Sequence, residues 1–238
     1  MTRIASSEQP AVSLRISAID PQGVEELRSV RLKSDAGSTP RFDFTPGQFL
    51  HIRTPSGEAS YFAIASAPSE PHYDVLVKRA AGASRELFDL SVGTTVQVVG
   101  PQGKGFPLAG YAGCDVLLIG VGTGIAPLRS VVGWTLAHRE QFGRLTLLHG
   151  VLTPPHCCYR SDFESWRTAG VDARVTVTST AGHSWTGPVG FVQDLLPTLR
   201  IDPQRTVTCL VGMKEMVHAN TERLQQLGIP SERILLNF

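Results

Sequence analysis

The first half of the chain alternates short apolar runs with turn residues, a pattern typical of β-strands. Pairs such as Asp20-Pro21 and Pro46-Gly47 separate the runs. One stretch, residues 84–90, looks helical, with Ser84 as its expected N-cap. Six closely spaced strands favour a small antiparallel β-barrel. We predict these strands at residues 12–20, 27–33, 49–53, 62–65, 73–78 and 95–99.

From about residue 111 the pattern changes to strands that alternate with helices. Because this alternation requires crossover connections, we expect a doubly wound parallel sheet with helices on both faces. A Pro- and Gly-rich stretch marks the boundary, so we expect a barrel domain over residues 1–108 and an α/β domain over residues 109–238. The predicted strands are 116–120, 145–150, 174–178, 206–211 and 234–237, and the predicted helices are 126–138, 161–169, 191–196 and 214–227.

The composition of the 238 residues, 42% hydrophobic and 18% charged, is that of a globular protein. A net charge of +1 without a basic cluster argues against nucleic-acid binding. No apolar run is long enough to span a membrane, and the first residues lack the apolar core of an export signal, so we expect a cytoplasmic protein. The cysteines have neither metal-ligand nor iron–sulfur spacing, and we expect small buried hydrophobic residues at Cys114, Cys157, Cys158 and Cys209.

The most informative segment is residues 116–127, Val-Leu-Leu-Ile-Gly-Val-Gly-Thr-Gly-Ile-Ala-Pro. An apolar run that predicts a buried strand leads into Gly120, Gly122 and Gly124, and a helix opens near Pro127. Glycines let the backbone turn sharply and approach a phosphate, while a helix N-terminus directs unpaired N–H groups to the same point. The segment predicts a seat for a nucleotide pyrophosphate, although its Gly-x-Gly-x-Gly spacing also fits an ordinary strand-to-helix turn.

Six motifs occur in an order that resembles the ferredoxin–NADP reductase superfamily over nearly the whole chain. The resemblance implies a barrel that binds FAD and an α/β domain that binds NADH or NADPH. It also implies hydride transfer from nicotinamide to flavin, which then passes electrons to an acceptor. The motifs are Pro46-Gly-Gln-Phe49, Phe62-Ala-Ile-Ala-Ser66, Val77-Lys-Arg79 with Gly82-Ala-Ser84, Gly100-Pro-Gln-Gly103, Gly120-Val-Gly-Thr-Gly-Ile-Ala-Pro127 and Gly212-Met-Lys-Glu-Met216.

The resemblance implies a flavin site made of three segments. Lys78 and Arg79 have the charge suited to the flavin pyrophosphate, unless they are a solvated strand end. Gly82 and Ser84 begin a helix whose N-terminus can bind an anion, or Ser84 is a plain helix cap. The strand expected to run along the isoalloxazine ring, and to offer it main-chain hydrogen bonds, is Phe62, Ala63, Ile64, Ala65 and Ser66.

Two residues are the expected catalytic positions next to the reacting rings. Thr123, inside the glycine turn, is similar to the family threonine beside the nicotinamide. Phe238 is similar to the terminal aromatic that covers the flavin in plant-type reductases and moves to admit nicotinamide, unless it fills a core. A second nucleotide motif at a strand end, with core packing as the alternative for its last member, is Gly212, Met213 and Met216.

The flavin segment departs from the family pattern Arg-x-Tyr-Ser-x-x-Ser. Ser60 replaces the arginine and cannot supply its charge. Phe62 keeps a ring but loses a hydroxyl, and Ala63 replaces the serine that approaches the reactive flavin nitrogen. Either neighbouring cations take over the phosphate and flavin binds more loosely, which we favour, or flavin binding has been lost. The cations available for this task are Lys78, Arg79 and Arg85.

The nicotinamide side also departs from the family pattern. Val211 stands where relatives often have a cysteine, and Cys209 faces the same way along the strand without reaching the ring, so we expect slower hydride transfer. NADP-specific relatives place Ser-Arg after the third strand of this domain. The pair here is Ser179-Thr180, and the nearest potential cation is His183, which is mostly neutral at pH 7. This favours NADH over NADPH.

The sequence thus predicts a flavin-dependent oxidoreductase that passes electrons to a separate acceptor: a ferredoxin, an oxygenase, another redox partner or free flavin. No side chain need act as a strong acid or base, because flavin accepts the hydride directly. The alternative is a regulatory or electron-transfer subunit that uses the same fold for binding, with weak or lost flavin.

Overall fold

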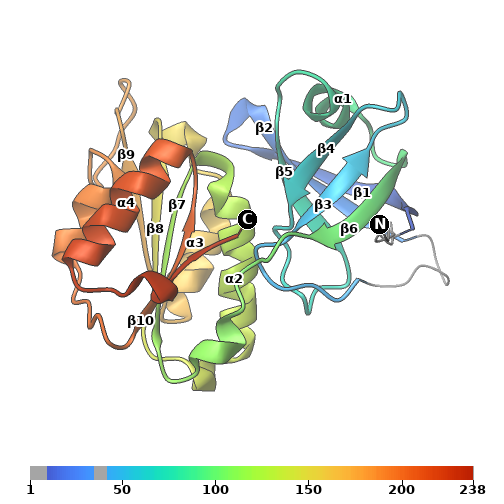
Figure 1. Cartoon of the computed structure of the whole chain (residues 1–238). Helices are drawn as coiled ribbons and strands as arrows, with labels where there is room; N and C mark the ends of the chain where they lie inside the picture. Colours follow the sequence, from blue (N-terminus) through green and yellow to red (C-terminus); the bar gives the residue numbers. More distant parts are fainter. Residues whose placement is uncertain (1–9, 35–41, 238) are drawn as a thin grey trace, which may run out of the picture.

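The computed structural model describes residues 10–34 and 42–237, whose strands form two separate sheets (Figure 1). The first sheet is antiparallel, with strand order β4-β3-β6-β1-β2-β5. Just beyond β4, Ile64 forms an antiparallel bridge to Val75, so the two edge strands of this sheet meet. The strands are β1 (Val12–Gln22), β2 (Val24–Lys33), β3 (Phe49–Arg53), β4 (Ala59–Ala63), β5 (Tyr73–Lys78) and β6 (Thr95–Gln102).

The apolar core of this first sheet follows from the alternation of side chains along its strands. In β3, Leu50 and Ile52 are fully buried, whereas His51 between them is only half-buried. Since β4 pairs with β3 in antiparallel register, with Tyr61 opposite His51, the outer face of the hairpin carries both of these rings. Helix α1 (Ala83–Asp89) packs Leu87 into the same core.

The second sheet is parallel, with strand order β11-β10-β7-β8-β9. Helices α2 (Ile125–Ala137) and α3 (Arg160–Thr168) pack on one face, and α4 (Lys214–Gln226) and the 3-10 helix η5 (Val192–Thr198) pack on the other. From β7 the chain adds β8 and β9 on one side of the sheet and then β10 and β11 on the other side, so the strand order reverses between β7 and β10. The strands are β7 (Asp115–Val121), β8 (Leu145–Val151), β9 (Asp172–Val177), β10 (Thr206–Val211) and β11 (Ile234–Leu236).

Short 3-10 helices fill several connections. The remaining ones are η1 (Leu108–Tyr111), η2 (Gly122–Gly124), η3 (Arg139–Gln141), η4 (Pro154–His156) and η6 (Ser231–Arg233). No helix among the described residues combines the length and apolar character that crossing a lipid bilayer requires.

The two sheets contact each other through α2 and through the end of the chain. A Cβ at Gly133 in α2 would lie 2.7 Å from the Cβ of Ala67, so the helix and the barrel segment approach more closely than a side chain at position 133 would allow. The side-chain amide of Asn237 donates to the carbonyl of Gly47 over 3.2 Å, which fixes the described end of the chain against the barrel. These two contacts add to a buried apolar core that Leu27 and Leu76 of the barrel share with α2.

Several predicted bounds differ from the structure by one to three residues, as in β2 and β6, and three differences bear on the site or on the type of element. The strand predicted at 62–65 is β4, residues 59–63, because the whole of this segment pairs with β3. The helix predicted at 191–196 is the 3-10 helix η5, which contains Pro197. Ser84 is not the N-cap of α1; Gly82 takes that place with a φ of 62°, a conformation that favours glycine, so the helix begins at Ala83. Phe238 lies outside the described residues.

Candidate coenzyme-binding site

Both predicted nucleotide motifs lie where the strand order of the parallel sheet reverses. β7 runs through η2 into α2, and its Gly120 is opposite Val211 at the end of β10. Gly212 follows directly. Ligands of open α/β sheets bind outside the carboxyl ends of the strands at such a reversal. The crevice between β7 and β10 is therefore the position at which this topology accepts a nucleotide.

The three glycines of the turn have different environments. A Cβ at Gly120 would lie 2.7 Å from Cδ1 of Leu128, and one at Gly124 would lie 3.1 Å from the carbonyl oxygen of Val211. Gly122 has a φ of +54°, and no heavy atom of the described chain beyond its sequence neighbours lies within 4 Å of the position its Cβ would take. Gly120 and Gly124 thus permit tight packing of the turn, whereas Gly122 leaves an open surface for a ligand.

The helix that follows the turn completes this cradle. Thr123 is exposed beside Gly122, at the start of a helix of 13 residues whose first N–H groups have no partner within the helix. Pro127 is buried in the first turn, where it shapes the helix and offers no surface. The amide of Ile125 is bonded to the carbonyl oxygens of Gly122 and Thr123, and Pro127 has no N–H, so the helix dipole is the main feature that favours an anion at this end of α2.

The residues predicted around the turn are only partly accessible. Met213 is 68% exposed, whereas Met216 is half-buried and occupies the space that a side chain at Gly212 would need. Ser179 is exposed after β9, and its hydroxyl accepts a hydrogen bond from the amide of Ala181 over 3.2 Å. The structure therefore brings Gly212, Met213 and Ser179 to the carboxyl edge of the sheet and turns Met216 toward the core.

The cysteine predicted near the site is inside the protein. Cys209 is fully buried, and burial raises the pKa of its thiol well above the ordinary value. It belongs to the core on the α2 face of the sheet, so the thiol does not line the crevice. Cys157 and Cys158 are buried as predicted, and burial raises the pKa of Cys158 to about 12.

The aromatic residue expected on the flavin side, Phe62, is buried, and its neighbour Tyr61 is exposed. Phe62 is opposite Leu50 in the β3–β4 hairpin and is 6% exposed inside the barrel core, so its ring does not face the crevice. Tyr61 is 59% exposed on the outer face. Its ring centroid lies 5.5 Å from that of Phe49 and 4.8 Å from that of His51. The sequence motif did not reveal which of these two rings is exposed, because only the strand register decides which one points outward.

The main chain after β4 is already engaged within the barrel. The amide of Ile64 donates to Gln48 over 3.0 Å, and the amide of Ala65 donates to Asp74 over 2.7 Å. Ser66 is fully buried. Half-buried Ala63 is the member of the predicted stretch that shares the outer face with Tyr61.

The predicted phosphate anchor is a helix start with mixed charge. Lys78 and Arg79 are exposed at the end of β5, and Arg79 is 3.1 Å from a carboxylate oxygen of Asp89. Within the residues the structure describes, Lys78 has no ion-pair partner. Glu86, in the first turn of α1, accepts a hydrogen bond from the hydroxyl of Thr54 over 2.6 Å, which ties the β3–β4 hairpin to the helix.

Comparisons with known proteins agree with this arrangement. Residues 118–222 match the oxidoreductase NAD-binding domain family. Ferredoxin–NADP reductase B of Sorangium cellulosum is 31% identical over 92% of this chain and 94% of its own length. The electron transfer subunit of dihydroorotate dehydrogenase B (NAD(+)) of Shouchella clausii is 32% identical over 76% of this chain and 67% of its own. A ferredoxin NADP+ reductase of Neisseria gonorrhoeae, solved with bound FAD and NADP, has the same fold, with a TM-score of 0.80 at 17% identity over 95% of this chain and 97% of its own.

The antiparallel six-stranded sheet followed by a parallel sheet with a glycine turn is the two-domain fold of that ferredoxin NADP+ reductase. The chain belongs to the ferredoxin–NADP reductase family. The superfamily and fold class predicted from the sequence are thereby confirmed.

Proposed function

We propose that this chain is an NAD(P)H-dependent flavoprotein reductase that holds FAD on its barrel, holds NADH on its α/β domain and passes electrons to a separate redox acceptor. Membership of a family of NAD(P)H-dependent flavoprotein reductases supports the reaction class. The observation that carries the assignment is that η2, the glycine turn, packs against β5, next to the predicted flavin segment. When bound, flavin supplies the acceptor for hydride from nicotinamide, and the protein supplies orientation.

The domain division supports this arrangement. The antiparallel sheet ends at Gln102 and the parallel sheet begins at Asp115, with η1 in the connection. We assign residues 1–108 to FAD binding and residues 109–238 to nucleotide binding.

On the flavin side, the outer face of β3 and β4 offers a platform for a ring. Tyr61 takes the place first expected for Phe62, with Ala63 beside it. A Cβ at Gly103 would lie 2.6 Å from Phe49 and 3.2 Å from the carbonyl oxygen of Asn237, so the described end of the chain runs past this platform. The position of Asn237 supports a role for the residue that follows it, Phe238, as a cover over the flavin.

Tyr61→Ala is expected to weaken FAD binding by about tenfold, since an aromatic contact contributes roughly 0.5–1.5 kcal/mol beyond the burial of its area. FAD fluorescence titration measures this effect. Phe62→Leu is the matched control, because it alters the barrel core and is expected to lower the melting temperature with FAD affinity unchanged. Equal losses of affinity in both variants would contradict the placement on Tyr61.

On the nucleotide side, Gly122, Thr123 and the first turn of α2 form the pyrophosphate seat, and Thr123 lies next to the nicotinamide. Phe191 is 59% exposed at the same carboxyl edge as Met213. We propose that the adenine ring binds against one of these two exposed apolar side chains. The sequence analysis placed Phe191 in a helix and did not predict it as a site residue. The available signal was an aromatic residue directly after Gly190, at the start of an element.

NADH is the favoured coenzyme, because the loop after β9 carries His183 and no Lys or Arg between residues 178 and 190. Thr180→Arg is expected to raise the kcat/KM ratio of NADPH over NADH by about tenfold, through a charged fork for the 2′-phosphate. Steady-state kinetics with both coenzymes measure this ratio, with Thr180→Gln as the uncharged control. An unchanged kcat/KM ratio would show that the 2′-phosphate does not bind at this loop.

A regulatory or electron-transfer subunit with weak flavin binding is the second candidate, favoured by the changes at Ser60 and Ala63 and by the burial of Phe62. Colour separates the two functions. The reductase is expected to bind FAD, absorb at about 450 nm and bleach with NADH in the absence of oxygen. A colourless protein that neither takes up added FAD nor oxidises NADH would support the second function and overturn the first.

A further inference from the structure

Arg129, in the second turn of α2, bonds to both domains at once. Its terminal nitrogen donates to the carbonyl of Ala65 over 3.0 Å, and its Nε donates to a carboxylate oxygen of Asp162 in α3 over 2.6 Å. Its guanidinium carbon lies 5.0 Å from the ring centroid of Tyr159. The side chain is only 18% exposed. One guanidinium therefore links α2, α3 and the segment that follows β4.

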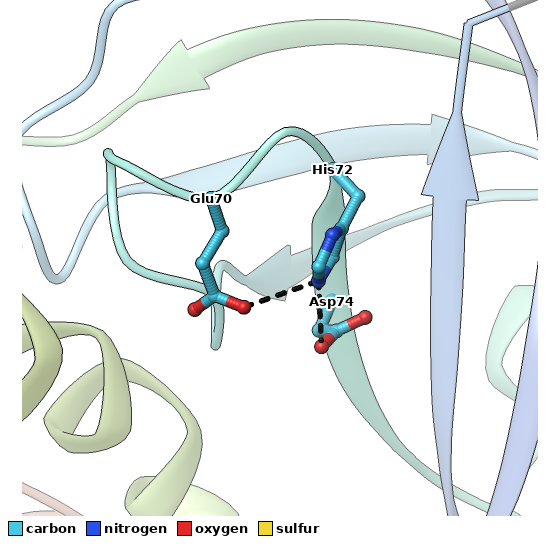
Figure 2. A group of neighbouring side chains, drawn as sticks. All are labelled: Glu70, His72 and Asp74. Carbon is cyan, nitrogen blue, oxygen red and sulfur yellow. Dashed lines mark ion pairs between the residues drawn. The ribbon is translucent and has the colours of Figure 1, made fainter.

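The barrel supplies further charge to this guanidinium. Arg129 lies 3.6 Å from Glu70 and 3.8 Å from Asp74. Figure 2 shows His72 between these two carboxylates, with its Nε2 3.2 Å from Glu70 and 3.3 Å from Asp74. Arg31 binds Asp74 in a bidentate pair, at 2.8 and 3.0 Å.

This cluster of two carboxylates and a histidine has the residue types of a metal site. However, the guanidinium of Arg31 already takes both oxygens of Asp74, and a second guanidinium lies within 4 Å. These two positive charges oppose a divalent cation and are balanced by the same carboxylates. The cluster is better explained as the anionic partner of Arg129 and Arg31.

Polar side chains and buried apolar residues both contribute to this part of the interface, where Leu27 and Leu76 of the barrel belong to the same core as α2. Arg129, Asp162 and Tyr159 border a cavity of about 460 Å³ between the barrel and the α/β domain. Burial opposes the charge of Arg129, but the nearby carboxylate of Asp162 keeps its pKa above the ordinary value, so the guanidinium stays ionised.

The Arg129–Ala65 bond joins the two halves of the proposed reaction site. Arg129 follows Gly124 by five residues on the same rigid helix that opens at the dinucleotide seat. Ala65 lies in the stretch that the family resemblance places along the isoalloxazine ring. A bond between them fixes how far the glycine turn lies from that stretch.

We propose that Arg129 is a positioning residue that sets the distance between the nicotinamide seat and the flavin segment. The inference rests on the proposed function. A lysine keeps the charge but cannot donate in two fixed directions from one planar group. A displacement of about 1 Å between reacting groups can cost about 100-fold in rate, so loss of one of these bonds is expected to act on hydride transfer.

Arg129→Lys tests the inference, with Arg174→Lys as the matched control. Arg174 also makes a bidentate pair, with Asp172 at 2.9 and 2.7 Å, and a third bond to Thr198, but it borders the amino end of the parallel sheet. In FAD-loaded protein, Arg129→Lys is expected to slow flavin reduction at saturating NADH by about tenfold or more. It is also expected to raise the deuterium isotope effect with 4-deuterated NADH. Dissociation constants for FAD and NADH stay within about twofold, and Arg174→Lys changes none of these quantities.

A second readout does not depend on activity. In FAD-free protein, hydrogen–deuterium exchange of peptides spanning residues 64–74 is expected to rise in Arg129→Lys and to stay unchanged in Arg174→Lys. If Arg129→Lys fails to fold, Asp162→Asn removes the charge from one partner and is expected to show both effects more weakly.

The outcomes separate the two levels of the proposal. The positioning role alone is overturned if NADH reduces the flavin of the wild type, Arg129→Lys and Asp162→Asn at the same rate and with the same isotope effect. A wild-type protein that binds FAD but is not reduced by NADH or NADPH overturns the proposed function. In that case, unchanged hydrogen–deuterium exchange of residues 64–74 in the variants also shows that the Arg129–Ala65 bond does not hold the domains together. Raised exchange shows that the bond stabilises the interface without a role in hydride transfer.

Discussion

Gly124→Val is expected to abolish most NADH-dependent reduction while leaving FAD bound. The added Cβ would lie 3.1 Å from the carbonyl oxygen of Val211 and 3.2 Å from its side chain, so the turn must move away from β10. That movement displaces Gly122 and Thr123, which border the open side of the seat. Since a shift of about 1 Å can cost about 100-fold in rate, we expect a loss of that size in stopped-flow flavin reduction.

Gly110→Val is the control for this experiment. Gly110 lies in η1, and the position of its Cβ has no described neighbour within 4 Å. FAD content and NADH-dependent rate are expected to match those of the wild-type protein. A Gly124→Val protein that keeps the original rate of flavin reduction would show that the dinucleotide binds elsewhere.

The stability of the fold is expected to fall between about pH 6.5 and pH 4 because of one buried histidine. His149 is fully buried in β8, opposite Gly120, with its ring centroid 6.1 Å from that of Phe163. Burial lowers its pKa from 6.5 to about 4. In this pH window the unfolded chain binds a proton that the folded protein does not, so protons favour unfolding as the pH falls. At pH 5 this linkage corresponds to about 2 kcal/mol.

His149→Leu is expected to remove this part of the pH dependence. Urea unfolding at pH 7.5 and pH 5 measures it: the wild-type protein loses about 2 kcal/mol more than the variant over that interval. His183→Gln, an exposed histidine, is expected to behave as the wild type does. Parallel pH profiles for wild type and His149→Leu would show that His149 protonates without cost in the folded protein.

Most of the fold could be predicted because its signals are local. The glycines at 120, 122 and 124 predict the turn because of their conformational freedom, and the alternation of strands and helices predicts the parallel sheet. The boundaries failed where pairing decided them. β4 starts at Ala59 because β3 extends that far as a partner, and α1 starts at Ala83 because Gly82 adopts a positive φ.

The candidate site was predictable in position but less so in its side chains. The motif alignment identified Phe62, yet the pairing of Leu50 with Phe62 turns that ring into the core and leaves Tyr61 outside. Cys209 was placed on the correct strand, but the parallel pairing with β7 and the packing of α2 enclose it. A one-residue change of register reverses every side chain of a strand, and sequence spacing alone does not fix the register.

By itself, the sequence determined the two-part architecture, the family and the glycine turn, because each depends on residues that are neighbours along the chain. Only the tertiary structure decided that Tyr61 faces outward and that Arg129 joins Ala65 to Asp162. These contacts link residues 64 and 33 positions apart, and their geometry exists only after both sheets have formed. The physical reason is that a strand alternates its side chains between two faces, but pairing and packing decide which face meets the core and which partner a side chain reaches.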